Sequence, residues 1–176
     1  PLLVNSSLIV VPSEYFKNIE LNKIPGIVSE QLLVSASGGV DKNVFTHLDG
    51  YRGLTGTIVY VSRIDTGKGW DILIDAVSEL RSRGKIIGKR VLFVGYGTQT
   101  ELLEKKIKEL DLLEYCSYLG PKTHQEINEL YNQADVMIFP TMLYESLGLV
   151  GLEAMACGCP VIGSNIGCLP EYVKDG

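Results

Sequence analysis

The sequence lacks the features that mark several common classes of protein. No apolar run in its 176 residues approaches the ~20 residues that a membrane-spanning helix needs. We expect no signal peptide, because these residues do not show a charged head followed by an apolar centre. The sequence also has no basic excess, because 16 Lys and Arg stand against 21 Asp and Glu, for a net charge of −5. A general nucleic-acid-binding protein usually shows a basic excess or a basic stripe, so we expect no nucleic-acid partner.

Cysteine and histidine are also scarce, and their spacing fits no metal or disulfide site. Three of the four cysteines lie close together at Cys157, Cys159 and Cys168, but they form neither a redox CxxC motif nor a zinc pair. The two histidines, His47 and His124, lie far from them in the sequence. A chain of this size can bury a core without disulfides. We therefore expect reduced, partly buried thiols in a cytoplasmic protein, and no metal.

What is present is typical of a folded domain. Hydrophobic residues make up 45% of the chain and charged residues 21%, which is too apolar for a disordered segment. The length suits one domain or slightly more. The chain begins at Pro1 rather than at Met, and we expect it to lack the beginning of a longer parent.

From Gly56 onward, strand and helix patterns alternate with short joints. Thr57–Val61 is a continuous apolar and β-branched run, as expected of a strand buried on both faces. The alternation predicts an α/β fold, a Rossmann-like, doubly wound parallel sheet in a three-layer α/β/α arrangement. In the first helix we expect Leu73, Ala76, Val77 and Leu80 on the buried face. The expected strands are 57–61, 91–94, 115–119, 136–139 and 160–162, and the expected helices are 70–80, 101–110, 123–133, 147–156 and 170–173.

The first 50 residues have a different pattern. They contain a short strand at 8–11, a helical turn at 14–18, a strand at 31–34 and a polar joint from 41 to 52. The sequence therefore predicts two parts, a strand–helix–strand piece with a linker over 1–50 and the α/β domain over 51–176. Because the first piece cannot bury both of its faces alone, it indicates a missing partner domain.

Two cations follow the first strand of the predicted domain. In a doubly wound sheet, ligands bind beyond the carboxyl ends of the strands. Arg63 and Lys68 lie there, on a glycine-containing loop that enters a helix. A guanidinium and an ammonium beside a helix N-terminus suit a diphosphate, although two solvated surface charges remain an alternative. The lone pair Gly95 and Gly97 lacks the third glycine of a dinucleotide fingerprint, which disfavours a nicotinamide site.

Two carboxylates follow the fourth strand. Glu145 precedes the helix expected at 147–156, and Glu153 lies inside it. Carboxylates accept hydrogen bonds from vicinal hydroxyls, so one could hold a ribose and the other a sugar. Glu145 could instead be a helix-dipole or cap residue, and Glu153 an exposed helix acid. A general acid/base pair is the least favoured interpretation. The apolar neighbours of Glu153 favour a partner or a ligand for its carboxylate.

These residues belong to a longer stretch that resembles a known family. Residues 140–162 (PTMLYESLGLVGLEAMACGCPVI) closely resemble the E-x7-E region of glycosyltransferase family 4, retaining nucleotide-sugar enzymes of the GT-B fold. The chain as a whole is similar to the C-terminal, nucleotide-sugar-binding domain of that family, and its front is similar to the close of the N-terminal domain. The supporting stretches are 11–15, 39–45, 61–65, 68–69, 94–97, 119–122, 134–136 and 169–171.

The resemblance implies roles for the charged residues. Arg63, Lys68 and Glu145 would be catalytic: the two cations would bind the diphosphate and stabilise the leaving nucleotide, and Glu145 would hold a hydroxyl of the donor sugar. Glu153 would hold the ribose. No metal or other cofactor is implied, because the two cations replace it, and no protein nucleophile is needed. The remaining implied donor-binding positions are Gly97, Leu119, Lys122, Ser146, Leu147, Gly148 and Leu149.

The sequence departs from the family at two of these positions. Ser146 stands where glycine is common, and Leu147 where an aromatic residue is frequent. Both departures adjoin Glu145. They could alter the pocket for the donor sugar, although contacts made by the backbone would survive.

The resemblance also implies an overall function. The chain would be the donor-binding portion of a retaining glycosyltransferase that transfers a sugar from a UDP- or GDP-sugar to a glycan or lipid-linked acceptor, in polysaccharide biosynthesis. The acceptor would be held by the missing N-terminal domain, so the isolated piece would be inactive. A cytoplasmic location is expected, with a peripheral place at the inner membrane face left open. The alternatives are a non-catalytic nucleotide-sugar-binding domain and a GT-B sugar-nucleotide epimerase.

Overall fold

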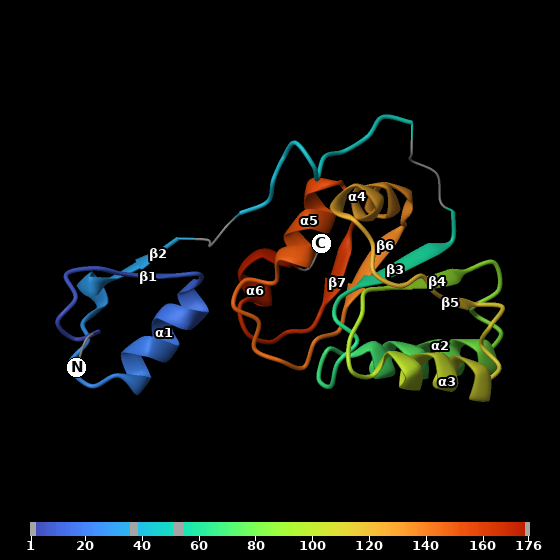
Figure 1. Cartoon of the computed structure of the whole chain (residues 1–176), viewed down its shortest axis with the longest axis horizontal. Helices are drawn as coiled ribbons and strands as arrows, with labels where there is room; N and C mark the ends of the chain where they lie inside the picture. Colours follow the sequence, from blue (N-terminus) through green and yellow to red (C-terminus); the bar gives the residue numbers. More distant parts are fainter. Residues whose placement is uncertain (1–2, 36–38, 51–54, 175–176) are drawn as a thin grey trace.

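The larger part of the chain forms one parallel sheet. The computed structural model describes residues 3–35, 39–50 and 55–174, so residues 51–54, just after the expected boundary at 50–51, lie outside it. The five strands stand in the order β5-β4-β3-β6-β7, and every neighbouring pair is parallel (Figure 1). They are β3 (Thr57–Val61), β4 (Arg90–Val94), β5 (Cys116–Tyr118), β6 (Val136–Phe139) and β7 (Val161–Gly163). The predicted α/β fold class is confirmed.

Helices cover both faces of this sheet. On one face lie α2 (Trp70–Ser82) and α3 (Thr100–Glu109), and on the other lie α4 (His124–Gln133) and α5 (Leu149–Ala156) (Figure 1). Along β3, Tyr60 packs with the α2 and α3 side chains while Val59 and Val61 pack with those of α4 and α5. This alternation confirms that β3 is buried on both faces. None of the described helices is long and apolar enough to cross a lipid bilayer.

Two helix predictions were wrong in detail. Ala76 and Leu80 are exposed on α2, where the buried face consists instead of Trp70, Leu73, Ile74 and Val77. Trp70 is 1% exposed in the core shared with α3, and its indole Nε1 donates to Gln99 Oε1 at 3.0 Å. The helix expected at 147–156 begins at Leu149, because Gly148 has a left-handed backbone (φ 72°) that no helical residue adopts.

The N-terminal unit is a small separate sheet with its own helix. It contains β1 (Ile9–Val11), α1 (Glu14–Lys23), the short 3₁₀ helix η1 (Ser29–Gln31) and β2 (Leu32–Val34), and β1 pairs parallel with β2. Its core is small, with Val11, Ile27 and Leu32 buried. α1 extends well past the helical turn expected at 14–18, and Ser13 caps it by accepting from the Phe16 N–H at 3.2 Å.

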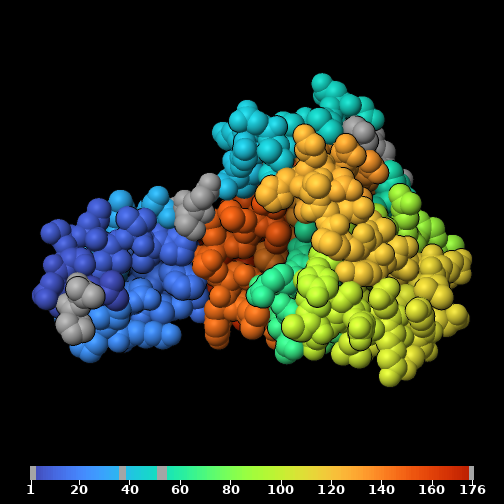
Figure 2. Space-filling view, viewed as in Figure 1, coloured from blue at the N-terminus to red at the C-terminus, as the bar shows by residue number. Residues whose placement is uncertain are grey.

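This unit packs against the C-terminal end of the chain, where Figure 2 shows it lying against the orange-red segment. The Glu171 carboxylate of α6 (Leu169–Tyr172) accepts from the backbone N–H groups of Glu14 (3.1 Å) and Tyr15 (2.7 Å). The ring of Tyr15 also stacks on that of Tyr144, with centroids 5.7 Å apart. A carboxylate from one unit thus caps the first helix of the other.

The segment expected to be a linker is bound to the domain. Phe45 is only 4% exposed and packs in the core on the α4 side of the sheet. Two buried asparagines of α4 hold the backbone beyond it. Asn128 Oδ1 accepts from the Thr46 N–H at 3.1 Å, and Asn132 Oδ1 accepts from the Leu48 N–H at 2.7 Å. Asn132 Nδ2 donates in return to the Thr46 carbonyl at 2.9 Å.

The four cysteines are free and buried. Burial raises the pKa of Cys157 to about 11 and that of Cys159 to about 12, so both stay protonated at neutral pH. Low thiolate content makes these side chains unreactive. The prediction of unpaired thiols is confirmed, and their burial is more complete than expected.

The asparagine contacts generate a stability prediction. Asn132→Ala leaves the Leu48 N–H and the Thr46 carbonyl without their side-chain partner, and we expect the free energy of unfolding to fall by about 1–3 kcal/mol. Gln125→Ala, an exposed amide on the same helix, is the matched control and should change it by less than about 0.5 kcal/mol. Urea unfolding followed by circular dichroism measures both. Equal effects of the two substitutions would contradict a structural role for the asparagine contacts.

Candidate functional site

The strand order places one crevice at the carboxyl ends of β3 and β6. From β3, the chain continues to β4 on one side and returns to β6 on the other, and ligands bind at such a reversal point in open α/β sheets. A cavity of about 270 Å³ lies there. Its lining comes from the loop after β3, the end of β6 and the start of α5: Ser62, Arg63, Lys68, Phe139, Glu145, Ser146, Leu147, Gly148, Leu149 and Val150.

The centre of the site is an ion pair between the two loops. Lys68 Nζ donates to Glu145 Oε1 at 2.7 Å. The side chains of Lys68 and Glu145 are only 11% and 17% exposed, so water screens the pair little. The Tyr60 hydroxyl, below the loop, donates to the Lys68 carbonyl at 3.1 Å and fixes the backbone that carries the ammonium.

Close backbone packing holds these loops together. Gly69, the N-cap of α2, has φ +76°, and a Cβ built on it would lie 1.9 Å from the Pro140 carbonyl oxygen. Two residues after Pro140, the Met142 N–H donates to the Gly67 carbonyl at 2.7 Å. The approach of Lys68 to Glu145 therefore depends on a glycine whose missing side chain lets the two loops touch.

The second cation, Arg63, has a different environment. Its side chain is 70% exposed, and its Nη1 lies 3.0 Å from Asp65 Oδ2. Asp65 is itself held by Thr98, whose N–H (2.7 Å) and hydroxyl (2.8 Å) donate to Oδ1. These two hydrogen bonds lower the pKa of Asp65, with a smaller contribution from Arg63. Arg63 is thus an exposed guanidinium at the mouth of the cavity, paired with Asp65, whereas Lys68 is largely buried in its ion pair with Glu145.

The start of α5 completes the lining of the cavity. Its N-cap, Gly148, packs against Phe139 and the Tyr172 hydroxyl, where a Cβ would lie 2.9 and 2.8 Å away. The Tyr172 hydroxyl donates to the Gly148 carbonyl at 2.9 Å. The first N–H groups of a helix have no partner within the helix and carry partial positive charge. This end of α5 is therefore able to bind an anionic group in the cavity.

The remaining predicted residues lie outside the cavity. The Gly97 N–H donates to Thr100 Oγ1 at 3.1 Å, the Leu119 N–H donates to the Phe93 carbonyl at 2.9 Å, and Lys122 pairs with Glu126 at 3.1 Å. Hydrogen bonds from Thr123, and then from Lys122, lower the pKa of Glu126 to about 2. Seven of the eleven predicted site residues line the cavity, and Gly97, Leu119, Lys122 and Glu153 do not.

Glu153 has the environment of a carboxylate without a strong partner. It lies half-buried on α5, and burial raises its pKa above the ordinary value, while the nearby His124 at the start of α4 lowers it by a smaller amount. Within residues 3–35, 39–50 and 55–174, no hydrogen bond or ion pair to this carboxylate is found. Such a group is able to accept a hydrogen bond from a ligand hydroxyl.

Ser62, Phe139 and Val150 also line the cavity, although they are not among the predicted site residues. Phe139 and Val150 have the sequence pattern of a core strand and a helix, and no local motif marks them as site residues. The described part of the chain contains no cluster of three or more His, Cys, Asp or Glu side chains suited to a metal ion. That the site works without a metal stays a prediction.

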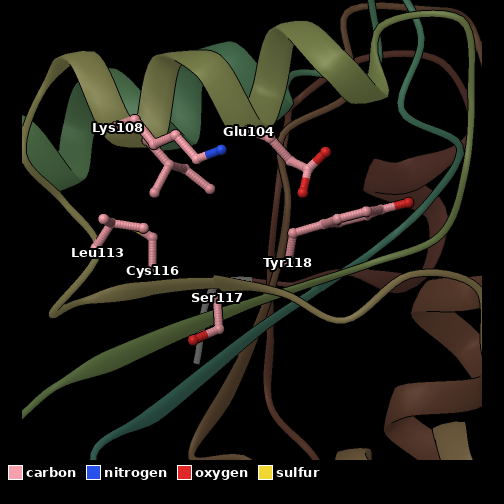
Figure 3. Close-up of a pocket in the computed structure, with 7 residues that line it drawn as sticks. Glu104, Lys108, Leu113, Cys116, Ser117 and Tyr118 are labelled. Atoms are coloured by element: carbon pink, nitrogen blue, oxygen red, sulfur yellow. The ribbon is translucent and has the colours of Figure 1, made fainter.

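A second cavity, of about 280 Å³, lies along the edge strand β5 beneath α3. Figure 3 shows Glu104 and Lys108 from α3 above it and residues of β5 below it. It is separate from the crevice between β3 and β6. None of the eleven predicted site residues lines it.

The fold and the crevice define a doubly wound α/β domain with a charged cavity, and comparison with known proteins identifies its family. The sequence profile of the family described as Glycosyl transferases group 1 matches residues 54–176. The chain belongs to this family of glycosyltransferases.

Individual relatives agree with this assignment. The chain is 34% identical over 151 residues to a D-inositol 3-phosphate glycosyltransferase of Mycolicibacterium smegmatis, covering 78% of this chain and 33% of that protein. It is 26% identical to the solved sucrose-phosphate synthase of Thermosynechococcus elongatus, with a TM-score of 0.81 over 98% of this chain and 44% of that one. Anabaena Alr3699/HepE, solved with UDP-glucose, shares the fold, with 24% identity and a TM-score of 0.79 over 96% of this chain and 48% of that one. The chain thus spans about a third of the M. smegmatis relative and under half of these structures.

The glycine contact between the loops gives a prediction with a matched control. Gly69→Ala places a methyl group against the Pro140 carbonyl, and we expect it to lower the free energy of unfolding by about 3 kcal/mol or more. Gly84→Ala has a similar φ (+65°) but nothing within 4 Å, so it reports only the backbone cost, about 1 kcal/mol. Urea unfolding of both variants isolates the steric part. Equal losses would show that the loops do not depend on this contact.

The environment of Glu153 predicts a pH-dependent gain in stability. Because burial raises the pKa of Glu153 above 4.5, ionising it costs stability in the folded state, and this cost grows as pH rises from 4.5 through the raised pKa. We expect Glu153→Gln to raise Tm at pH 7 by about 1–2 °C, a small change because water still reaches the carboxylate. At pH 4 the two proteins should have the same Tm in calorimetric scans. A lower Tm for the variant at pH 7 would contradict this account.

Proposed function

We propose that the chain is the donor-binding part of a retaining glycosyltransferase that takes a sugar from a nucleoside-diphosphate sugar. One observation carries the proposal: two cations, a helix N-terminus and a carboxylate line the same cavity at the reversal point of the sheet. A nucleoside-diphosphate sugar offers two negative phosphates beside a polyhydroxylated ring. The charges of this cavity suit both parts of such a ligand.

Each charged group has a distinct task in this proposal. Lys68 and the start of α5 bind the diphosphate, and the exposed Arg63 turns from Asp65 to join them. As the bond between the sugar and the diphosphate breaks, negative charge grows on the leaving nucleotide, and these fixed donors stabilise it. Glu145 accepts a hydrogen bond from a sugar hydroxyl. The half-buried Glu153 accepts from the ribose, and the backbone near Gly97 and 119–122 lies beside the nucleoside.

The configuration of the anomeric carbon is retained if the acceptor attacks this carbon from the same side from which the nucleotide leaves. The acceptor hydroxyl forms the new bond to the anomeric carbon, the bond to the diphosphate breaks, and the departing phosphate takes the hydroxyl proton. No protein nucleophile and no metal is needed for this sequence. The preorganised cations supply the electrostatic stabilisation instead.

The identity of the donor is supported by the structural neighbours. The Anabaena protein was solved with UDP-glucose, so uridine nucleotides are the first candidates, followed by GDP-sugars. For the acceptor, we propose a glycan or a lipid-linked glycan in polysaccharide biosynthesis. It would be held by a second domain, of which the N-terminal unit of this chain is the closing part. The parent would work in the cytoplasm, with the inner membrane face as an alternative site.

Nucleotide binding tests this function directly. In isothermal titration calorimetry with uridine, UDP, GDP, UDP-glucose, UDP-GlcNAc and GDP-mannose, we expect diphosphates to bind and uridine to bind far more weakly. Arg63→Ala should weaken UDP binding about 10-fold or more, because a charge-assisted hydrogen bond is lost. Arg63 is exposed, so the fold is unaffected. Lys85→Ala removes an exposed cation away from the cavity and should leave binding unchanged. A folded chain that binds none of these nucleotides would overturn the proposed function.

A further inference from the structure

A threonine that no motif singled out lies directly beneath Glu145. Thr141 follows β6 and is completely buried, with 0% of its surface exposed. Its hydroxyl lies 3.0 Å from Glu145 Oε1 and 3.2 Å from the backbone nitrogen of Leu143. A buried hydroxyl in contact with the carboxylate of a binding site is able to control how that carboxylate points.

The hydrogen-bond partners show which of them the Thr141 hydroxyl accepts from and which it donates to. The Leu143 N–H can only donate, so the Thr141 oxygen accepts from it. The single hydroxyl proton then has two possible acceptors, Glu145 Oε1 at 3.0 Å and the Gly67 carbonyl at 3.5 Å. The shorter contact takes the proton, because hydroxyl hydrogen bonds weaken beyond about 3.0 Å. The hydroxyl therefore donates to Glu145.

The two oxygens of Glu145 consequently differ. Oε1 accepts from the Lys68 ammonium at 2.7 Å and from the Thr141 hydroxyl at 3.0 Å. For Oε2, the described residues provide no hydrogen bond or ion pair. Two donors on one oxygen prevent the carboxylate from turning about its last bond. The other oxygen is left for a ligand.

We propose that Thr141 is a positioning residue that holds Glu145 with Oε2 available to a hydroxyl of the bound sugar. Lys68 alone cannot do this, because an ammonium carries three equivalent donors on a flexible stem and tolerates many carboxylate orientations. In the proposed function, Lys68 also binds the diphosphate. Thr141 has a short, buried side chain whose hydroxyl makes two hydrogen bonds. It therefore fixes the orientation of the Glu145 carboxylate, which Lys68 alone does not. This inference rests on the proposed function, and it adds Thr141 as the residue that orients Glu145 toward the sugar.

The ratio of two affinities tests the proposal. The probe is the sugar nucleotide that binds most tightly in the panel above, compared with its own nucleoside diphosphate by calorimetry. Thr141→Val keeps the shape but removes the hydroxyl. We expect the preference for the sugar nucleotide to fall about five-fold, the usual effect of one hydrogen bond, while the diphosphate binds as before. Thr141→Ser keeps the hydroxyl and should retain most of the preference.

Two controls separate positioning from general damage. In the Glu145→Ala background, Thr141→Val should cause no further loss of preference, because the group that Thr141 positions is absent. If the valine variant does not fold by circular dichroism, Thr141→Ala removes the same hydroxyl and takes its place. A purely structural role would lower both affinities together and leave their ratio unchanged.

The outcomes are distinct. A selective loss in the valine variant, with rescue by serine, supports the positioning role. An unchanged ratio, or an equal loss with valine and serine, overturns it while nucleotide binding by the unsubstituted chain still stands. An unsubstituted chain that binds its sugar nucleotide no better than the diphosphate also overturns it. A chain that binds no nucleotide overturns the proposed function and this inference with it.

Discussion

The contact between the loops after β3 and β6 is the constraint on which the rest of the site depends. Lys68 and Glu145 pair at 2.7 Å in a largely buried place, where an unpaired charge would be costly. The two residues are far apart in the sequence, and only the order of the parallel strands brings their loops together. A glycine at position 69 then allows the backbones to touch. The sheet topology, the backbone conformation and the ion pair therefore support one another.

The two cations of the site differ in how far they are buried. The Lys68 ammonium pairs with Glu145, and the Lys68 backbone carbonyl accepts from the Tyr60 hydroxyl. Arg63, in contrast, lies on the surface beside Asp65. Fixed groups lower the reorganisation needed when charge develops during a reaction. An exposed guanidinium, by contrast, is able to close over a ligand after it has entered. A cavity with both kinds of cation is suited to a charged ligand that must enter from water and then be held.

Much of the fold could be predicted from the sequence, because the strands are short apolar runs and the helices have strong periodicity. The capping box of α4 is local, because Thr123 and Glu126 stand only three residues apart in the sequence. The errors lie where tertiary contacts decide. Ala76 and Leu80 have the right spacing for a core, but α2 packs through Trp70, Leu73, Ile74 and Val77, which leaves both of them exposed. The polar 41–50 segment gave no sign that buried asparagines some 80 residues later would bind it.

The same reasoning applies to the site. The alternating pattern placed Arg63, Lys68 and Glu145 at one rim, and the structure brings them to one cavity. The contact between Thr141 and Glu145 depends on the turn after β6. The conformation of this turn is set by the hydrogen bond from Met142 to Gly67, a residue far away in the sequence.

The stacking of Tyr15 on Tyr144 connects the N-terminal unit to the site. Tyr144 immediately precedes Glu145, and α1 carries Tyr15. The N-terminal unit therefore touches the chain one residue away from the carboxylate of the site, so the loop that carries Glu145 is supported from both units.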